Sequence, residues 1–204
     1  MLFEEIRIRD VRIRNRIVVS PMCQYSARDG QVSDWHLVHL GKFAQGGAGA
    51  VFVEATAVEK RGRITHGDTG IWDDAHIAGL QKIASFIKSQ GAVPAIQLAH
   101  AGRKASMARP WYGNGPLTPA DSERGDKAWS IVAPTEAPIG DEWLKPRPLQ
   151  KGDLENSLGT TERQAISVKD DMALTGILST QIVIDRFVNH FSSVNHGYAY
   201  QGTA

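Results

Sequence analysis

The chain has 204 residues, the length of one ordinary domain or of a small two-domain protein, and needs neither disulfides nor metals to hold a core. Hydrophobic residues make up 42% and charged residues 22%, which excludes disordered and collagen-like proteins. With 23 basic and 22 acidic residues, the net charge is +1. This balance argues against nucleic acid and anionic membranes as partners, because both attract clustered Lys and Arg.

The sequence also predicts the compartment. No apolar run approaches the roughly 18 residues of a membrane-spanning helix, and residues 1–10 carry charges where a signal peptide is apolar. The only cysteine, Cys23, has no partner for an internal disulfide. We therefore expect a cytoplasmic protein with no membrane partner. A lone cysteine is also, most often, a small buried side chain without chemistry.

The first elements in chain order are a strand, a helix and a second strand. An apolar β-branched run at 17–19 predicts a strand that ends at Ser20-Pro21, because proline donates no ladder hydrogen bond. Ser33-Asp34 predicts the cap of a helix that runs to Gly46-Gly47. The nearly continuous apolar run at 50–54 predicts a strand that is covered on both faces.

A loop over 55–74 separates this strand from a second helix. Asp73-Asp74 predicts the cap of that helix, whose apolar positions recur at helical spacing until Gly91. The segment 92–98 predicts a third strand, although Pro94 argues against a central place in a sheet. Strands and helices that alternate with short connections indicate right-handed βαβ units, and hence an α/β fold.

After Arg103 the periodicity is lost in a long stretch rich in proline. Tryptophans at 111, 129 and 143 indicate that this stretch packs, because disordered segments are poor in aromatic residues. From about residue 150 the composition turns polar. The elements we expect there are a helix over 165–178 and a short strand over 181–185.

Polar or unusual side chains follow the C-terminal end of each predicted strand, in segments 20–25, 54–57 and 97–104. In parallel α/β proteins, ligands bind at that edge of the sheet. Polar strand ends also occur for solvation alone, so one such loop would carry little information. Because polar residues follow all three predicted strands, the sequence predicts a single binding site at this edge of the sheet.

Two other patterns have alternative interpretations. His36 and His39 lie on one predicted helix at a spacing that suits metal ligands, which would suggest a metal-dependent hydrolase. No carboxylate pair accompanies them, and histidines on amphipathic helices more often face solvent or the edge of the core. The glycine-rich segment 46–49 precedes a strand, whereas a phosphate-binding loop opens a helix, so it indicates a turn.

The same strand ends resemble those of a known family. The segments that carry the resemblance are RNRIVVSPMCQY at 14–25, VEATAV at 53–58, GRI at 62–64, GIW at 70–72 and IQLAHAGRK at 96–104. They are similar to the Old Yellow Enzyme family of FMN-dependent oxidoreductases, particularly its cysteine-containing bacterial ene-reductase branch. The resemblance extends from about residue 2 to about residue 150.

The resemblance implies a TIM barrel with FMN at its C-terminal mouth. It further implies hydride transfer from NAD(P)H through FMN to an activated alkene, such as an α,β-unsaturated carbonyl compound. Cys23 and Tyr25 would be catalytic, the thiol by tuning the flavin and the hydroxyl by bonding a substrate carbonyl. The cofactor-binding residues that the resemblance implies are Ser20, Pro21, Met22, Cys23, Ala55 and Gln97.

The resemblance covers only part of the family's barrel. A closed (β/α)8 barrel typically has about 250 residues, so we expect an incomplete barrel made of the first three to four βα units. Residues 1–150 would be the N-terminal part of an FMN-binding TIM barrel, and residues 151–204 a divergent tail. In that tail, 196–198 partly match the family's substrate-binding motif.

An incomplete barrel exposes an unpaired strand edge. Such an edge is a template for pairing with another chain, and we therefore expect a homo-oligomer or a completing chain as partner. The alternative function is a non-catalytic barrel fragment that folds or acts only with that chain.

Overall fold

The computed structural model describes residues 1–153. The chain divides into two units, Met1–Leu149 and Gln150–Ala204, and the fold described below is that of the first. The helix expected over 165–178, the strand expected over 181–185 and the motif at 196–198 lie outside the described residues.

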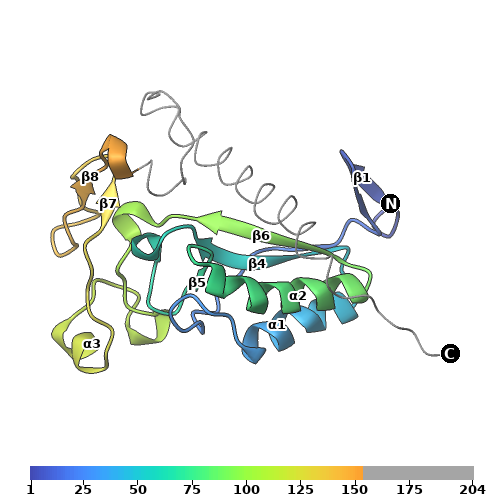
Figure 1. Ribbon diagram of the computed structural model, residues 1–204, viewed down its shortest axis with the longest axis horizontal. Helices are drawn as coiled ribbons and strands as arrows, with labels where there is room; N and C mark the ends of the chain where they lie inside the picture. Colours follow the sequence, from blue (N-terminus) through green and yellow to red (C-terminus); the bar gives the residue numbers. More distant parts are fainter. Residues whose placement is uncertain (154–204) are drawn as a thin grey trace. The chain divides into compact units, whose positions relative to one another are not determined.

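A parallel sheet forms the centre of the first unit (Figure 1). Its longest strand, β4, pairs with β6 on one edge, and with β3 and β5 at opposite ends of the other edge. The strands are β3 (Val18–Val19), β4 (Ala50–Ala57), β5 (Thr69–Gly70) and β6 (Val93–Ala99). The three predicted strands are confirmed, and β4 extends into the segment that we expected to be a loop.

Two helices, α1 (Asp34–Gln45) and α2 (Ile77–Ser89), cover one face of this sheet (Figure 1). α1 packs on β4, α2 packs on β6, and the helices contact each other. Both predicted caps are present. The Ser33 N–H donates to Nδ1 of His36, and Asp73 caps the short turn Asp74–His76 that leads into α2. The buried side chains between the layers include Leu40, Ala44, Val51, Val53, Leu80, Ile83 and Ile87.

An antiparallel hairpin, β1 (Ile6–Ile8) and β2 (Val11–Ile13), precedes the sheet and was absent from our predictions. Its signal is the alternation of aliphatic residues with arginines between positions 6 and 13, which is the period of a strand with one covered face. Arg9 makes the turn with a φ of 53°. Each strand has only three residues, which makes the alternation too short to identify a strand by itself.

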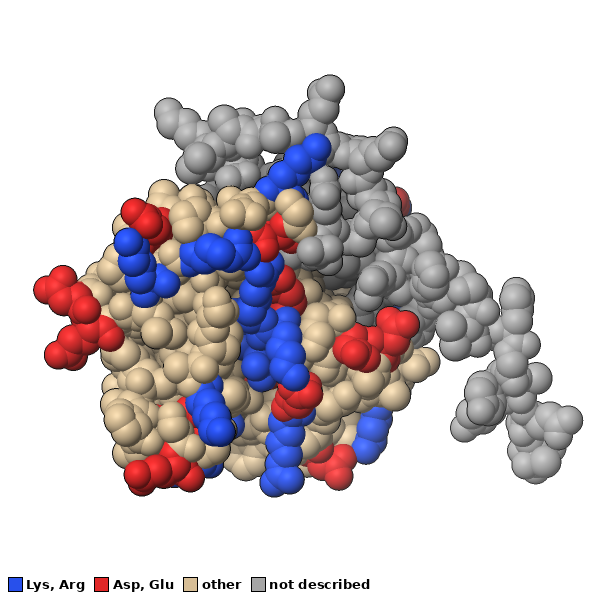
Figure 2. All heavy atoms as spheres, turned by 60° about the vertical axis from the view of Figure 1, so that its left-hand side comes forward, with Lys and Arg blue, Asp and Glu red and all other residues tan. Residues whose placement is uncertain are grey.

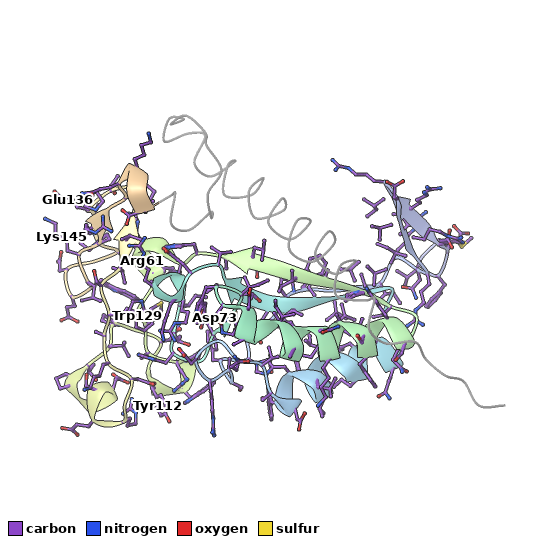
Figure 3. The ribbon with its side chains drawn as sticks, in the orientation of Figure 1. Arg61, Asp73, Tyr112, Trp129, Glu136 and Lys145 are labelled. Atoms are coloured by element: carbon purple, nitrogen blue, oxygen red, sulfur yellow. The ribbon has the colours of Figure 1, made fainter. Side chains whose placement is uncertain are left out.

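The proline-rich stretch after β6 forms short elements: turns at Gly102–Lys104 and Pro110–Tyr112, α3 (Pro119–Glu123), β7 (Val132–Ala133) and β8 (Arg147–Pro148). Trp129 confirms that the stretch packs, because its Nε1 donates to the carbonyl of Arg61 at 3.0 Å (Figure 3). The guanidinium of Arg63 lies 4.9 Å from the centre of the same ring. Trp111, in contrast, is 57% exposed.

The surface agrees with the balanced charge of the sequence. Lys and Arg side chains are interspersed with Asp and Glu over the described part of the face shown in Figure 2. Among residues 1–153, no helix is long and apolar enough to cross a membrane.

Arg14 joins the ends of both helices at the amino-terminal edge of the sheet. Its Nη2 donates to the carbonyls of Ala44 and Ala48 at 3.0 and 2.9 Å, and its Nη1 donates to that of Gln90 at 2.8 Å. The last carbonyls of a helix have no partner within the helix and carry the negative end of its dipole. A planar guanidinium reaches several of them at once, which the ammonium of a lysine does not.

We expect Arg14→Ala to lower the free energy of unfolding by about 1–3 kcal/mol, since it removes charged donors from partly buried carbonyls. Urea denaturation measures the loss. Arg12→Ala is the matched control, because Arg12, two residues earlier in β2, forms an exposed ion pair with Glu5 and such pairs add little stability. Equal losses in both variants would contradict the assignment.

Candidate functional site

The register of β4 against β6 shifts at the carboxyl end of the sheet. Val53 pairs with Ile96 and Ala55 pairs with Gln97, so β4 has one residue more than β6 at this point. That residue is Glu54. Such a β-bulge reorients the side chains around it, and bulges are common beside active sites. Val53, Glu54 and Ala55 are all buried because both faces of β4 are covered.

A hollow of about 400 Å³ lies at this edge, within the range of roughly 300–1,000 Å³ that is usual for small-molecule sites. Side chains from all three predicted loop segments contribute to it. Five of its ten lining residues are small or apolar, and the other five are polar. The lining residues are Tyr25, Ala55, Ile64, Gln97, Ala99, His100, Ala101, Lys104, Met107 and Asn114.

The structure brings most of the predicted site residues together. Tyr25, Ala55 and Gln97 line the hollow, and Ala55 is the direct strand partner of Gln97. The thiol of Cys23 lies beside them, with the Ala55 N–H and the Tyr25 hydroxyl in hydrogen-bonding positions. Gln97 is exposed, so its side-chain amide is accessible from the hollow.

The remaining predicted residues follow β3 but are not part of the lining. Ser20 and Met22 are exposed, Met22 by 44%, and Pro21 is half-buried. These residues lead directly into Cys23. Their assignment to cofactor binding therefore stays a prediction that rests on the family resemblance.

Tyr25 has a left-handed backbone conformation, with a φ of 50°. This conformation is unusual for a bulky side chain and is often found at functional sites. The ring packs edge-on against Trp111, with 6.4 Å between centroids. Burial, followed by the nearby Cys23, raises the pKa of Tyr25 to about 12. A tyrosine hydroxyl is neutral at physiological pH even at its ordinary pKa, and the raised pKa extends that neutral range, so Tyr25 can donate a hydrogen bond.

Gly67 packs closely against the backbone of Tyr25 and holds its left-handed conformation in place. A Cβ at position 67 would lie 2.0 Å from the carbonyl oxygen of Tyr25. The carbonyl of Gly67 also accepts from the Ala27 N–H at 2.9 Å. Only glycine leaves room for the chain to pass here, so this residue fixes the path of the loop that carries Tyr25.

The Cys23 thiol is a neutral group in this environment. Burial is the main cause that raises the pKa of Cys23, and the carboxylates of Glu54 and Asp68 raise it further. The hydrogen bonds from Ala55 and Tyr25 act in the opposite direction. Since only the thiolate is strongly nucleophilic, the surroundings favour a polarizable sulfur over a reactive one.

Glu54 is the most unusual ionisable group of the site, and the sequence analysis did not assign it a role. It is only 3% exposed. Burial raises the pKa of Glu54 to about 7, although backbone N–H groups of Gln24 and Tyr25 favour the ionised form. The sequence signal was a lone charge in an apolar strand, which predicts a special environment without revealing the contact.

His100 was expected only as part of a polar loop, and the structure gives it a defined partner. Its Nδ1 accepts from the Gly102 N–H at 3.0 Å, so its Nε2 carries the proton and donates to Oε1 of Glu59 at 2.6 Å. This pair fixes the orientation of a ring that lines the hollow. Glu59 is 41 residues away in sequence, and no local pattern indicates such a contact.

The histidines that suggested a metal have structural positions instead. His36 is buried and accepts from the Ser33 N–H at the start of α1. His39 packs edge-on against Phe43. Within residues 1–153 there is no group of three or more His, Cys, Asp or Glu side chains placed to hold a metal ion. The metal-dependent hydrolase is therefore not supported by the described part of the chain.

We expect Gly67→Ala to displace Tyr25 and to lower the free energy of unfolding by about 1–3 kcal/mol, because a methyl group would overlap a backbone oxygen. Urea denaturation checks the stability, and near-ultraviolet circular dichroism reports on Tyr25 and Trp111. Gly115→Ala is the control, since a Cβ there meets its nearest atom at 3.9 Å. An unchanged spectrum and stability in Gly67→Ala would refute the close approach.

The pKa of Glu54 predicts a pH dependence of stability. Its folded value of about 7 lies above the ordinary 4.5, so folding favours the protonated form. Its contribution is complete below about pH 4.5 and is lost as the pH rises through 7. Relative to Glu54→Gln, the wild type should lose up to about 3 kcal/mol between these limits. Urea denaturation at a series of pH values tests this, and parallel curves for the two proteins would rule it out.

Fold and site together define a parallel α/β protein with its ligand pocket at the carboxyl ends of the strands. The chain belongs to the NADH:flavin oxidoreductase / NADH oxidase family, whose family model matches residues 1–134. This is the Old Yellow Enzyme family that the sequence resembles. Its members use FMN, with NAD(P)H as reductant.

Curated relatives share substantial identity with the chain. An NADPH dehydrogenase of Geobacillus sp. (strain WCH70) is 40% identical over 172 residues, which are 83% of this chain and 45% of that protein. An NADH:flavin oxidoreductase of Gibberella zeae is 48% identical over 134 residues, which are 66% of this chain and 32% of that protein. The chain thus spans less than half the length of these relatives.

Solved structures show the same fold at lower identity. Morphinone reductase matches 76% of this chain and 42% of its own length, with 22% identity and a TM-score of 0.59. The Old Yellow Enzyme of Trypanosoma cruzi matches 76% of this chain and 44% of its own length, with 22% identity and a TM-score of 0.58. These are TIM-barrel proteins, and what they confirm for this chain is an α/β fold.

Proposed function

We propose that the chain forms the flavin-facing part of an Old Yellow Enzyme-type oxidoreductase, which transfers hydride from NAD(P)H through FMN to activated alkenes. The observation that carries this proposal is the convergence of the Cys23 thiol, the Tyr25 hydroxyl, the Ala55 backbone and the Gln97 amide at one hollow. They come from the ends of three neighbouring parallel strands.

The residues of the hollow fit a flat heteroaromatic ring. The Gln97 amide presents both a donor and an acceptor, which matches a ring edge that also presents both. Ala55, Ala99 and Ala101 are small, and they leave space for a planar group to approach the backbone. In this proposal Ser20, Pro21, Met22, Cys23, Ala55 and Gln97 hold FMN.

When bound, FMN supplies the hydride chemistry. The chain itself supplies binding and orientation. Tyr25 donates a hydrogen bond from its neutral hydroxyl to the carbonyl oxygen of an α,β-unsaturated substrate. Such a bond withdraws electron density from the alkene and favours attack at its β-carbon. The neutral Cys23 sulfur lies beside Ala55 and tunes the electronics of the ring.

The proposed architecture is the first three to four βα units of a TIM barrel in residues 1–150, followed by a divergent tail over 151–204. β4 is buried along its length, apart from Phe52, whereas β6 is only partly buried. This difference supports an edge at β6 where a complete barrel continues. We place the protein in the cytoplasm and propose a second copy or a completing chain as its partner.

FMN titration tests the proposed function. The wild-type chain should quench the fluorescence of added FMN, and Gln97→Leu should weaken binding by about tenfold or more, since an unpaired ring edge replaces direct hydrogen bonds. Gln90→Leu, which changes a glutamine beyond the end of α2, is the matched control. NADPH oxidation should then depend on 2-cyclohexenone. Protein that does not take up FMN would refute the cofactor assignment.

A non-catalytic barrel fragment is the second candidate function, and the partly buried β6 is the observation that favours it. Size-exclusion chromatography with light scattering distinguishes the two. An assembly that binds no FMN supports the fragment, whereas a flavin-binding species supports the oxidoreductase.

A further inference from the structure

The segment from Cys23 to Tyr25 runs beside the bulge of β4 without joining the sheet. β3 ends at Val19, and β5 meets β4 only at Thr56 and Ala57. The Gln24 N–H of this segment therefore finds its acceptor in a side chain. It donates to Oε2 of Glu54 at 2.9 Å, and the nearby Tyr25 N–H also favours the ionised form of this carboxyl group.

Glu54 reaches this position because of the bulge. The extra residue interrupts the alternation of β4 and places the carboxyl group under the segment. Its other oxygen, Oε1, is buried and has no hydrogen-bond partner among the described residues. A buried carboxyl group with a hydrogen-bond partner for only one of its two oxygens destabilises the fold. The presence of Glu54 among aliphatic residues therefore points to a specific role.

We propose that Glu54 is a positioning residue, whose carboxyl group anchors the Cys23–Tyr25 segment to the bulge of β4 and so sets the accessibility and ionisation of the Cys23 thiol. This inference deepens the proposed function, since Cys23 and Tyr25 belong to the proposed flavin site. Its test does not involve FMN, so that the two can fail independently.

The groups that face the thiol come from each neighbouring element. Glu54 approaches from β4, Asp68 from the loop before β5, and Tyr25 from the same segment. Asp68 accepts from the N–H groups of Ile64 and Thr65, at 2.6 and 3.0 Å, so its hydrogen bonds hold its own loop. Glu54 is the carboxyl group that contacts the segment directly.

The chain offers a clean probe, because Cys23 is its only cysteine. The rate of alkylation by iodoacetamide, measured against pH on the full chain without added flavin, gives two quantities. The midpoint reports the pKa of the thiol, and the plateau at high pH reports how accessible the thiolate is. A charge effect moves the midpoint, whereas a loosened segment raises the plateau.

Two substitutions separate these effects. Glu54→Gln keeps an oxygen for the Gln24 N–H but removes the charge, so its midpoint should move to lower pH while its plateau stays near that of the wild type. Glu54→Ala removes the anchor as well, and its plateau should rise by about tenfold or more, the factor for a hydrogen bond to a charged group. Asp121→Asn is the control, a buried carboxyl group whose partners are Thr118 and Arg124.

The proposal is overturned if the plateau of Glu54→Ala equals that of the wild type, or if Asp121→Asn raises it equally, which would indicate general destabilisation. If Glu54→Ala does not fold, Glu54→Asp replaces it as the test of the anchor. Its shorter side chain draws the carboxyl group away from the Gln24 N–H, so its plateau should rise, and an unchanged plateau contradicts the anchor. In Glu54→Gln, a midpoint moved to lower pH supports the charge effect of Glu54, and an unmoved midpoint contradicts it.

Discussion

The pairing of β4 along both of its edges is the constraint on which the rest of the first unit depends. β4 is the one strand that contacts β3, β5 and β6 within the described residues, and α1 packs on it. Because every partner is parallel to it, the chain must return between strands, and α1 and α2 are the helical returns that lead into β4 and β6. Because the strands are parallel, the loops that carry polar residues all follow their carboxyl ends and lie at that edge of the sheet.

The bulge in β4 links this architecture to chemistry. An undistorted strand would place either Glu54 or Ala55 toward the segment after β3, not both. With one extra residue, the backbone of Ala55 meets the Cys23 thiol while the carboxyl group of Glu54 accepts from the Gln24 N–H. A single irregularity in an otherwise regular sheet thus orders a segment that has no strand or helix of its own. The left-handed backbone of Tyr25 and the close packing of Gly67 against it also restrict the path of this segment.

The sequence predicted those parts of the molecule that depend on local patterns. The helix caps at Ser33 and Asp73 and the apolar runs of β4 and β6 are readable because each is governed by a few neighbouring residues. The bulge was not predictable, because a register depends on two strands at once. The hydrogen bond between Glu59 and His100 was not predictable either, because it joins loops that are distant in the chain. The left-handed backbone of Tyr25 likewise depends on close packing against Gly67, a residue far from it in sequence. The hairpin of β1 and β2 left a period-two signal that is short, because each strand has only three residues.

The position of Arg14 has a consequence for how the molecule tolerates change. Its carbonyl partners lie where β4 and β6 begin, whereas the hollow lies where they end, and eight residues of β4 separate the two by ~25 Å. Effects of substitutions at sites this far apart, without shared contacts, generally add independently. Substitutions that stabilise the helix C-termini can therefore offset the stability lost through substitutions in the loops around the hollow. Selection can thus act on stability at one end of the sheet and on specificity at the other.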